Sequence, residues 1–207
     1  MIVKETLKLL KTALMLLLLL SLITGFIYPS MITGLAQLLF PWQANGSLIK
    51  QHDKAIGSSL IGQSFNSPQY FWGRPSATTP YAYNAGSSSG SNLGPSNPDF
   101  LATIKNRVEH LQKSDPRHQR LIPVDLVTAS GSGLDPDISP LAALYQVPRI
   151  AKARGLSESE VDKLIQHLIN NRTLGILGEP YVNVLELNLA LDDLQHRQGS
   201  YDNSTTP

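Results

Sequence analysis

The sequence predicts a mixed α+β domain outside the cytoplasm, anchored by one N-terminal transmembrane helix. Residues 12–49 contain no Asp, Glu, Lys, Arg or His, while helix-like and strand-like patterns both occur in the rest of the chain. The mean hydropathy of -0.08 is too low for a protein with many membrane spans, so the apolar excess is concentrated in this first stretch. A chain of 207 residues then has room for one ordinary domain besides the anchor.

The uncharged stretch is long enough to cross a membrane, because a spanning helix needs about 20 mostly apolar residues. Residues 12–28 nearly suffice, and residues 31–40 could extend the helix beyond a kink or an outer end at Pro29. A core helix of a soluble protein is rarely uncharged on every face over such a length. The leucine run is also long for a secretory signal peptide and no clear A-x-A site follows it, which favours an uncleaved anchor.

Charges on the two sides of this stretch predict its orientation. Lys4, Lys8 and Lys11 precede it, offset only by Glu5, and no charge follows before Lys50. By the positive-inside rule the N-terminus is cytoplasmic and the domain is periplasmic, with the anchor in a bacterial inner (plasma) membrane. The expected division is residues 1–11 in the cytoplasm, 12–34 in the membrane, 35–54 as a connector, 55–198 as the periplasmic domain and 199–207 as a flexible tail.

Several kinds of site do not fit the composition. The chain has no cysteine, which excludes disulfides, thiolate metal sites and cysteine nucleophiles. Without the three anchor lysines and Glu5, the 17 basic and 16 acidic residues become 14 and 15, a balance that does not suit a nucleic-acid partner. No P-loop motif is present, and Asp125, Asp135 and Asp137 are too few ligands for a dedicated metal site.

The domain should combine short strands with helices that have clear ends. The predicted strands are residues 56–63, 69–73, 121–128 and 172–177, with a long loop at 81–98 and a turn-rich loop at 129–140. The predicted helices cover 98–113 after the N-cap Asn97, 140–155 with a kink or break at Pro148, the apolar stripe that follows the capping box of Ser157 and Glu160, and the chain from about Val184. Residues 181–189 also alternate well enough for a strand.

A charge-poor, aromatic segment is the feature that most suggests a partner. Arg74 is the only charged side chain between Lys54 and Asp99, and depletion of charge with Tyr, Trp and Arg is typical of interface cores. We therefore predict a partner-binding surface made of Tyr70, Trp72, Arg74, Tyr81, Tyr83, Ser91, Asn92 and Asn97. The alternative, strongest for Phe65 and Phe71, is that the aromatic residues fill the core of the domain itself.

Small residues in the anchor predict a second contact. Ser21, Gly25 and Gly34, with Thr24, could let another membrane helix approach closely. The alternative is that these residues are tolerated in a helix that faces lipid.

A serine-hydrolase site is the competing interpretation. Ser130 and Ser132 follow a predicted strand, but a nucleophile elbow needs glycine two residues to either side, and Ser132 has Ser130 and Leu134 there. None of the five histidines (His52, His110, His118, His167 and His196) lies in a recognisable triad frame. We expect no catalytic residue, and keep a membrane-anchored periplasmic serine hydrolase as the alternative function.

Five motifs, in order along the chain, resemble those of the KdpC family, the C subunit of bacterial potassium-transporting P-type ATPases. They are Ser-Leu-Ile-Gly-Gln-Ser-Phe at 59–65, Tyr-Phe-Trp-Gly-Arg-Pro-Ser-Ala at 70–77, Ser-Gly-Ser-Asn-Leu-Gly-Pro-Ser-Asn-Pro at 89–98, Val-Asp-Leu-Val-Thr-Ala-Ser-Gly-Ser-Gly-Leu-Asp-Pro at 124–136 and Gly-Glu-Pro-Tyr-Val-Asn-Val-Leu at 178–185. Ser88 and Tyr181 depart from the family pattern, in which a glycine and an arginine are expected.

The resemblance implies an accessory subunit of a high-affinity, ATP-driven potassium uptake complex. Its expected partners are a potassium-conducting A subunit and an ATPase B subunit, which would handle potassium, ATP and magnesium while this chain binds no cofactor directly. The family role is assembly of the complex and catalytic chaperoning that promotes ATP binding by the ATPase subunit. With only about 11 residues on the cytoplasmic side, we expect any such effect to pass through the membrane helices.

Overall fold

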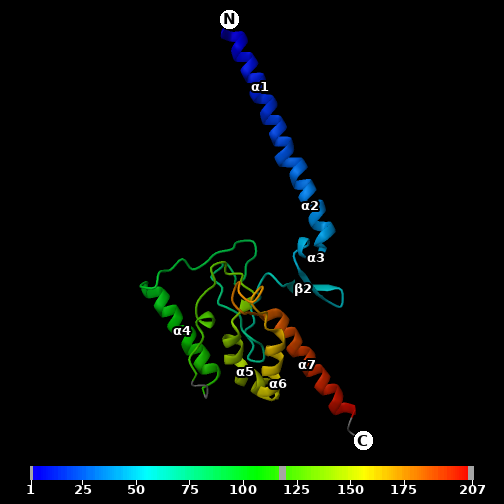
Figure 1. Ribbon diagram of the computed structural model, residues 1–207. Helices are drawn as coiled ribbons and strands as arrows, with labels where there is room; N and C mark the ends of the chain where they lie inside the picture. Colours follow the sequence, from blue (N-terminus) through cyan, green and yellow to red (C-terminus); the bar gives the residue numbers. More distant parts are fainter. Residues whose placement is uncertain (1, 117–119, 205–207) are drawn as a thin grey trace. The chain divides into compact units, whose positions relative to one another are not determined.

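The computed structural model describes residues 2–116 and 120–204. The chain forms two compact units, Met1–Leu48 and Ile49–Pro207 (Figure 1). The first contains α1 (Ile2–Leu22), the π-helical turn η1 (Ile23–Ile27), α2 (Tyr28–Leu39) and α3 (Pro41–Ala44). From the boundary onward follow β1 (Leu48–Gln51), β2 (Lys54–Ser58), α4 (Pro98–Ser114), the 3₁₀ turn η2 (Val124–Leu126), β3 (Asp137–Ile138), α5 (Pro140–Arg154), α6 (Glu158–Leu168), β4 (Val182–Asn183) and α7 (Val184–Ser204).

The apolar stretch forms a longer helix than expected. Within the described residues, Val3–Leu39 is the one helix that is long and apolar enough to cross a membrane, by length and composition. Pro29 does not end it, because η1 precedes this proline and the Tyr28 N–H donates to the Ile23 carbonyl, five residues earlier. A proline ring clashes with the carbonyl four residues before it in a regular helix, and the wider π turn accommodates it.

The predicted helices of the second unit are confirmed. The Asn97 side chain caps α4, Ser139 caps α5, and Ser157 with Glu160 forms a complete capping box on α6. Pro148 neither splits nor ends α5, which runs to a left-handed Gly155. The helix expected from Val184 is also present, and it continues through residues 199–204, where a flexible tail was expected. Residues 205–207 of that tail lie outside the described residues.

The predicted strands are largely wrong. Residues 69–73 and 172–177 form no strand, and residues 121–128 contain only η2. The strand expected at 56–63 is β2, which starts earlier and stops at Ser58 because the chain turns back to pair with Ile61. Two small sheets remain: β1 pairs with β2, and β3 pairs antiparallel with β4, with Ile138 opposite Val182. β1 lies in the expected connector, β4 lies at the start of the stretch 181–189 that alternates well enough for a strand, and β3 was not predicted.

The core of the second unit lies between the helices and this short β3–β4 ladder. α5 packs on α6, and α6 packs on α7 and on β4. The largest fully buried apolar side chains are Phe71, Ile138, Ile150, Val161, Ile165, Val182, Leu187 and Leu191. A mixed α+β body is therefore confirmed, with far fewer strand residues than the sequence pattern indicated.

Candidate functional site

Residues 71–78 of the charge-poor segment belong to no helix or strand. Side chains of helices bond the backbone there, as a neighbouring strand would. The Phe71 N–H donates to Asn188 Oδ1 (2.8 Å), and Asn188 Nδ2 donates to the Phe71 carbonyl (3.0 Å). Gln146 makes the same pair of bonds with Trp72, at 2.8 and 3.1 Å. Both amide side chains are almost completely buried. They satisfy backbone groups that would otherwise be unpaired inside the domain.

The aromatic side chains of this segment stack on arginines of α5. The Arg149 guanidinium lies 3.9 Å from the centroid of the Trp72 ring, and the Arg154 guanidinium lies 4.8 Å from that of Tyr70. Burial lowers the pKa of Arg149 to about 10. The Tyr70 hydroxyl also donates to Asp192 of α7 (3.2 Å). The two cation–π contacts attach the segment to α5, and the Tyr70 hydrogen bond attaches it to α7.

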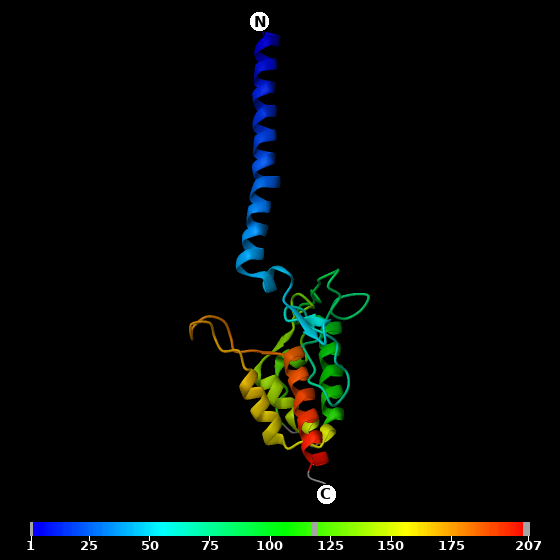
Figure 2. The ribbon, with the colours of Figure 1, turned by 90° about the vertical axis from the view of Figure 1, so that its right-hand side faces the viewer.

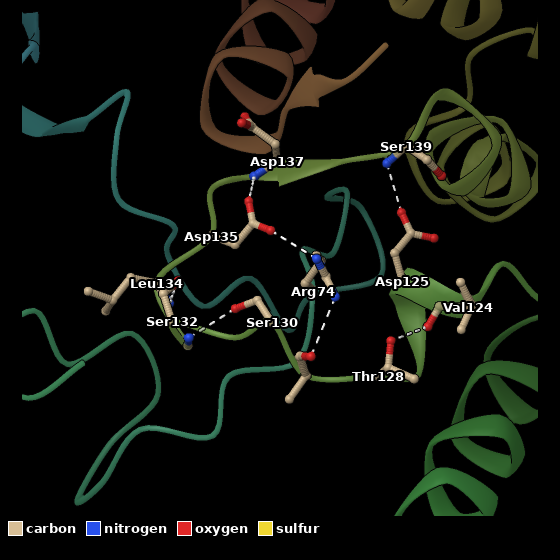
Figure 3. A network of polar contacts seen from close by, with 12 residues as sticks. Arg74, Val124, Asp125, Thr128, Ser130, Ser132, Leu134, Asp135, Asp137 and Ser139 are labelled. Carbon is tan, nitrogen blue, oxygen red and sulfur yellow. Dashed lines mark hydrogen bonds and ion pairs between the residues drawn. The ribbon is translucent and has the colours of Figure 1, made fainter. Parts of the chain in front are cut away.

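Arg74 is the centre of a polar network that joins this segment to the Ser/Gly-rich loop 129–136 (Figure 3). Its Nη1 lies 3.1 Å from Asp135 Oδ2, and its Nη2 donates to the Ala129 carbonyl (3.4 Å). The Nε atom is buried and has no hydrogen-bond partner among the described residues. Asp135 also accepts the Asp137 N–H (3.0 Å). Arg74, the single charge of the segment, therefore holds the loop 129–136 in place through Asp135, which lies 61 residues further along the chain.

A half-buried tyrosine, Tyr83, completes the network. The Tyr83 hydroxyl donates to the Arg74 carbonyl, and the Tyr83 N–H donates to Ser76 Oγ (2.9 Å). Burial, followed by the charge of Asp135, raises the pKa of Tyr83 to about 12. Tyr83 therefore stays neutral at physiological pH and acts as a hydrogen-bond donor.

Glycines let two Ser/Gly-rich loops, one within residues 81–98 and the other at 129–136, approach each other closely. A side chain at Gly133, which has φ +68°, would lie 2.5 Å from the Ser89 carbonyl oxygen, and one at Gly90 would lie 2.8 Å from the Gly131 oxygen. The Ser89 N–H and the Ser88 hydroxyl both donate to the Ser132 carbonyl, each at 3.0 Å. The glycines of these motifs therefore serve loop packing.

The serines of the alternative hydrolase site form hydrogen bonds within their own loop. Ser130 is 4% exposed and its Oγ accepts the Gly133 N–H, while Ser132 Oγ accepts the Leu134 N–H. In the part of the chain that the structure describes, no histidine bonds either hydroxyl.

Asp125 accepts the Ser139 N–H (2.7 Å) at the start of α5, and the described residues contain no group of three or more His, Cys, Asp or Glu that could hold a metal ion.

The structure divides the eight predicted interface residues into two sets. Tyr81 is 62% exposed, and Ser91 and Asn92 are exposed with it. The other five bond inside the domain: Tyr70, Trp72, Arg74 and Tyr83 as described above, and Asn97 as the cap of α4. Beside them is a pocket of about 400 Å³ whose walls include Trp72, Arg74, Tyr83, Arg107 and His110. Its aromatic rings and two arginines suit contact with side chains of another protein.

Two residues that build the site were not found by sequence reasoning. Gln146 and Asn188 are polar, yet each lies on the buried side of a helix. A polar residue at an apolar position of a helical pattern is the signal that could have identified them.

Comparison with known proteins places this architecture in a family. Residues 10–193 match the family described as "K+-transporting ATPase, c chain". The chain belongs to the KdpC family. A KdpC subunit from Methylococcus capsulatus is 60% identical over 185 residues, which is 89% of this chain and 97% of that protein. Another from Herpetosiphon aurantiacus is 58% identical over 175 residues, 84% of this chain and 91% of that protein. Both are named potassium-transporting ATPase KdpC subunits, so the KdpC resemblance of the sequence motifs is confirmed.

Proposed function

We propose that the chain is a non-catalytic accessory subunit of a high-affinity, ATP-driven potassium uptake complex, needed for its assembly and stability. The observation that carries the proposal is the match to the KdpC family from residue 10 to residue 193. In this proposal a potassium-conducting A subunit and an ATPase B subunit handle potassium, ATP and magnesium. The polar network of the second unit agrees with an assembly role. Its serines and carboxylates bond groups of the loops themselves and so hold the shape of the loops.

The proposed topology has the N-terminus in the cytoplasm and the domain in the periplasm, with the helix in the inner membrane. It is supported by Lys4, Lys8 and Lys11, which lie in the first turns of α1, before its uncharged stretch. An effect on ATP binding by the ATPase subunit would then pass through the membrane helices, where Ser21, Gly25 and Gly34 are exposed and free to contact a partner helix. Protease added outside spheroplasts should digest the domain, and protection of the domain would reverse the topology.

The proposed docking surface centres on the exposed residues Tyr81, Ser91 and Asn92. Tyr70, Trp72, Arg74, Tyr83 and Asn97 hold the loops behind these residues in place. We propose that this surface docks on the potassium-conducting subunit.

Deletion of the chain tests the function. A bacterium that depends on this complex should stop growing on scarce potassium, should recover when the chain is supplied again, and should grow normally on abundant potassium. Unimpaired growth of the deletion strain on scarce potassium would contradict the proposed function.

A further inference from the structure

The loop that joins α6 to α7 is a short hairpin. Asn170 and Tyr181 exchange backbone hydrogen bonds at its base (2.8 and 3.1 Å), and Thr173 and Leu177 exchange a second pair (2.9 and 3.0 Å). Residues 172 and 179 form an ion pair between these two rungs, with 2.6 Å between Arg172 Nη2 and Glu179 Oε2. We call residues 170–181 the finger. Figure 2 shows it as the orange loop that projects away from the helices.

The tip of the finger exposes three large aliphatic side chains. Leu174 is 85%, Ile176 is 74% and Leu177 is 58% exposed. Single exposed aliphatic residues are ordinary on a protein surface, but three within four consecutive residues make a contiguous apolar surface. Residues 173–178 carry no charge. Within the described part of the domain, the tip is left uncovered.

Leu174 also has an unfavourable backbone conformation. Leu174 and Gly175 have φ values of 54° and 77°, and the Ile176 N–H donates to the Thr173 carbonyl across them. A turn with positive φ at both central residues normally has Asn, Asp or Gly first. Leucine is strained there, and so exposed a side chain gains no packing inside the domain to offset the strain. Strain of this kind is typical of residues that serve a contact.

We propose that the finger inserts its apolar tip into an apolar groove of a partner subunit of the ATPase complex. This inference rests on the proposed function, because it requires the complex. Three aliphatic side chains offer roughly 300 Å² of apolar surface, whereas a standard interface buries roughly 800 Å² on each partner. The tip is therefore too small to hold two copies of this chain together by itself. Its size suits a small projection that inserts into a partner as part of a larger interface.

The composition of the tip, residues 173–178, argues against a membrane surface as the occupant. Loops and helices that bind bilayer surfaces carry Trp or Tyr with Lys or Arg near the lipid headgroups. Residues 173–178 have neither aromatic nor basic side chains. The nearest cation, Arg172, is neutralised by Glu179. A protein groove, which needs only apolar shape complementarity, suits the tip better.

Photo-crosslinking from the tip identifies what it contacts. The full chain, with p-benzoylphenylalanine in place of Ile176, is expressed with its complex in cells and irradiated. We expect an adduct whose mass is that of this chain plus another subunit of the complex. An adduct only with lipid, an adduct only with a second copy, or no adduct although the chain co-purifies with the complex would overturn the proposal.

Leu174→Asn separates the contact from folding. Asparagine suits the turn, so the variant should keep or raise the melting temperature of the full chain, while the yield of co-purified partner subunits should fall about tenfold. Leu121→Asn is the matched control, since Leu121 is 95% exposed and lies outside the finger. This variant should keep the wild-type yield.

Three results would overturn the proposal: unchanged assembly of Leu174→Asn, equal losses in the two variants, or loss of assembly together with a lower melting temperature. Failure of the proposed function is distinct, because the wild-type chain would then co-purify with no ATPase subunit.

Discussion

Buried amide side chains stabilise the segment that carries the predicted interface residues. Asn188 and Gln146 each pair with both backbone polar groups of one residue, Phe71 and Trp72. A leucine at position 188 would fill a similar volume but leave the N–H and carbonyl of Phe71 unpaired in the interior. Unpaired buried groups cost more than the hydrogen bonds contribute when they are made.

Asn188→Leu should therefore lower the free energy of unfolding by about 2 kcal/mol or more, although it makes the chain more apolar. The measurement is denaturant unfolding of the full chain followed by tryptophan fluorescence, to which Trp72 contributes. Gln166→Leu, an exposed amide on α6, should change the free energy by no more than about 0.5 kcal/mol. Equal effects of the two substitutions would contradict the role of Asn188.

Asp137 should make stability depend on pH. Burial, and then the charge of Asp135, raises the pKa of Asp137 to about 6, compared with about 4 in an unfolded chain. Between these values the folded state binds more protons, so this carboxyl makes stability fall as pH rises from about 4 to about 6. The Asn183 amide donates to Asp137 Oδ1 (3.2 Å). Asp137→Asn keeps an oxygen that can accept this bond and removes the titration.

The Asp137→Asn variant should melt at a higher temperature than the wild type above pH 6, and the difference should shrink toward pH 4. Thermal unfolding of the full chain at a series of pH values measures this difference. Asp193→Asn, on an exposed side chain of α7, serves as the control. A difference that stays constant from pH 4 to pH 7 would show that Asp137 does not titrate as described.

Sequence could identify Arg74 and Tyr83 as unusual but could not identify their partners. Arg74 is conspicuous because it is the only charge in a long segment. Its partner Asp135 is distant along the chain, and a periodic pattern carries no information on such pairing. The same limit applies to Asn188, whose contacts lie 117 residues away.

At the scale of elements, helices could be predicted and strands could not. Helix ends are determined by local groups, such as the Ser157 and Glu160 side chains that bond the first turn of α6. A strand needs a partner strand that can be distant along the chain. In residues 69–73, the backbone of Phe71 and Trp72 bonds helix side chains and not a neighbouring strand. β3 and β4 have two residues each. Such short strands give little alternation, and the pattern over residues 181–189 fitted a helix as well as a strand.

The apolar helix should do more than tether the domain. Its small residues would let a partner helix approach closely, so replacing residues 14–28 with an unrelated apolar span of equal length should reduce the yield of assembled complex. A matched variant that keeps Ser21, Gly25 and the η1–Pro29 region while its leucines are exchanged for isoleucine or valine should assemble normally. Full assembly and transport with the unrelated span would show that the helix is only an anchor.

At the scale of the whole molecule, the order of the motifs was enough to predict the family. Each motif is short, but five motifs in the same order are far more specific than any single one. The family match over residues 10–193 agrees with the family that they predicted. In the second unit three of the motifs, residues 70–77, 89–98 and 124–136, meet in the network around Arg74 and the Ser/Gly-rich loops. Sequence reasoning could not supply this arrangement, because it depends on contacts between distant loops.

Co-purification of the full chain from membranes tests the central claim most directly. A C-terminally tagged chain is extracted in mild detergent from cells grown on scarce potassium, and the bound proteins are identified and quantified by mass spectrometry. We predict that a potassium-conducting subunit and a P-type ATPase subunit come down in fixed proportion to this chain, with potassium-stimulated ATP hydrolysis in the same fraction. Recovery of the intact chain without either subunit would contradict the account.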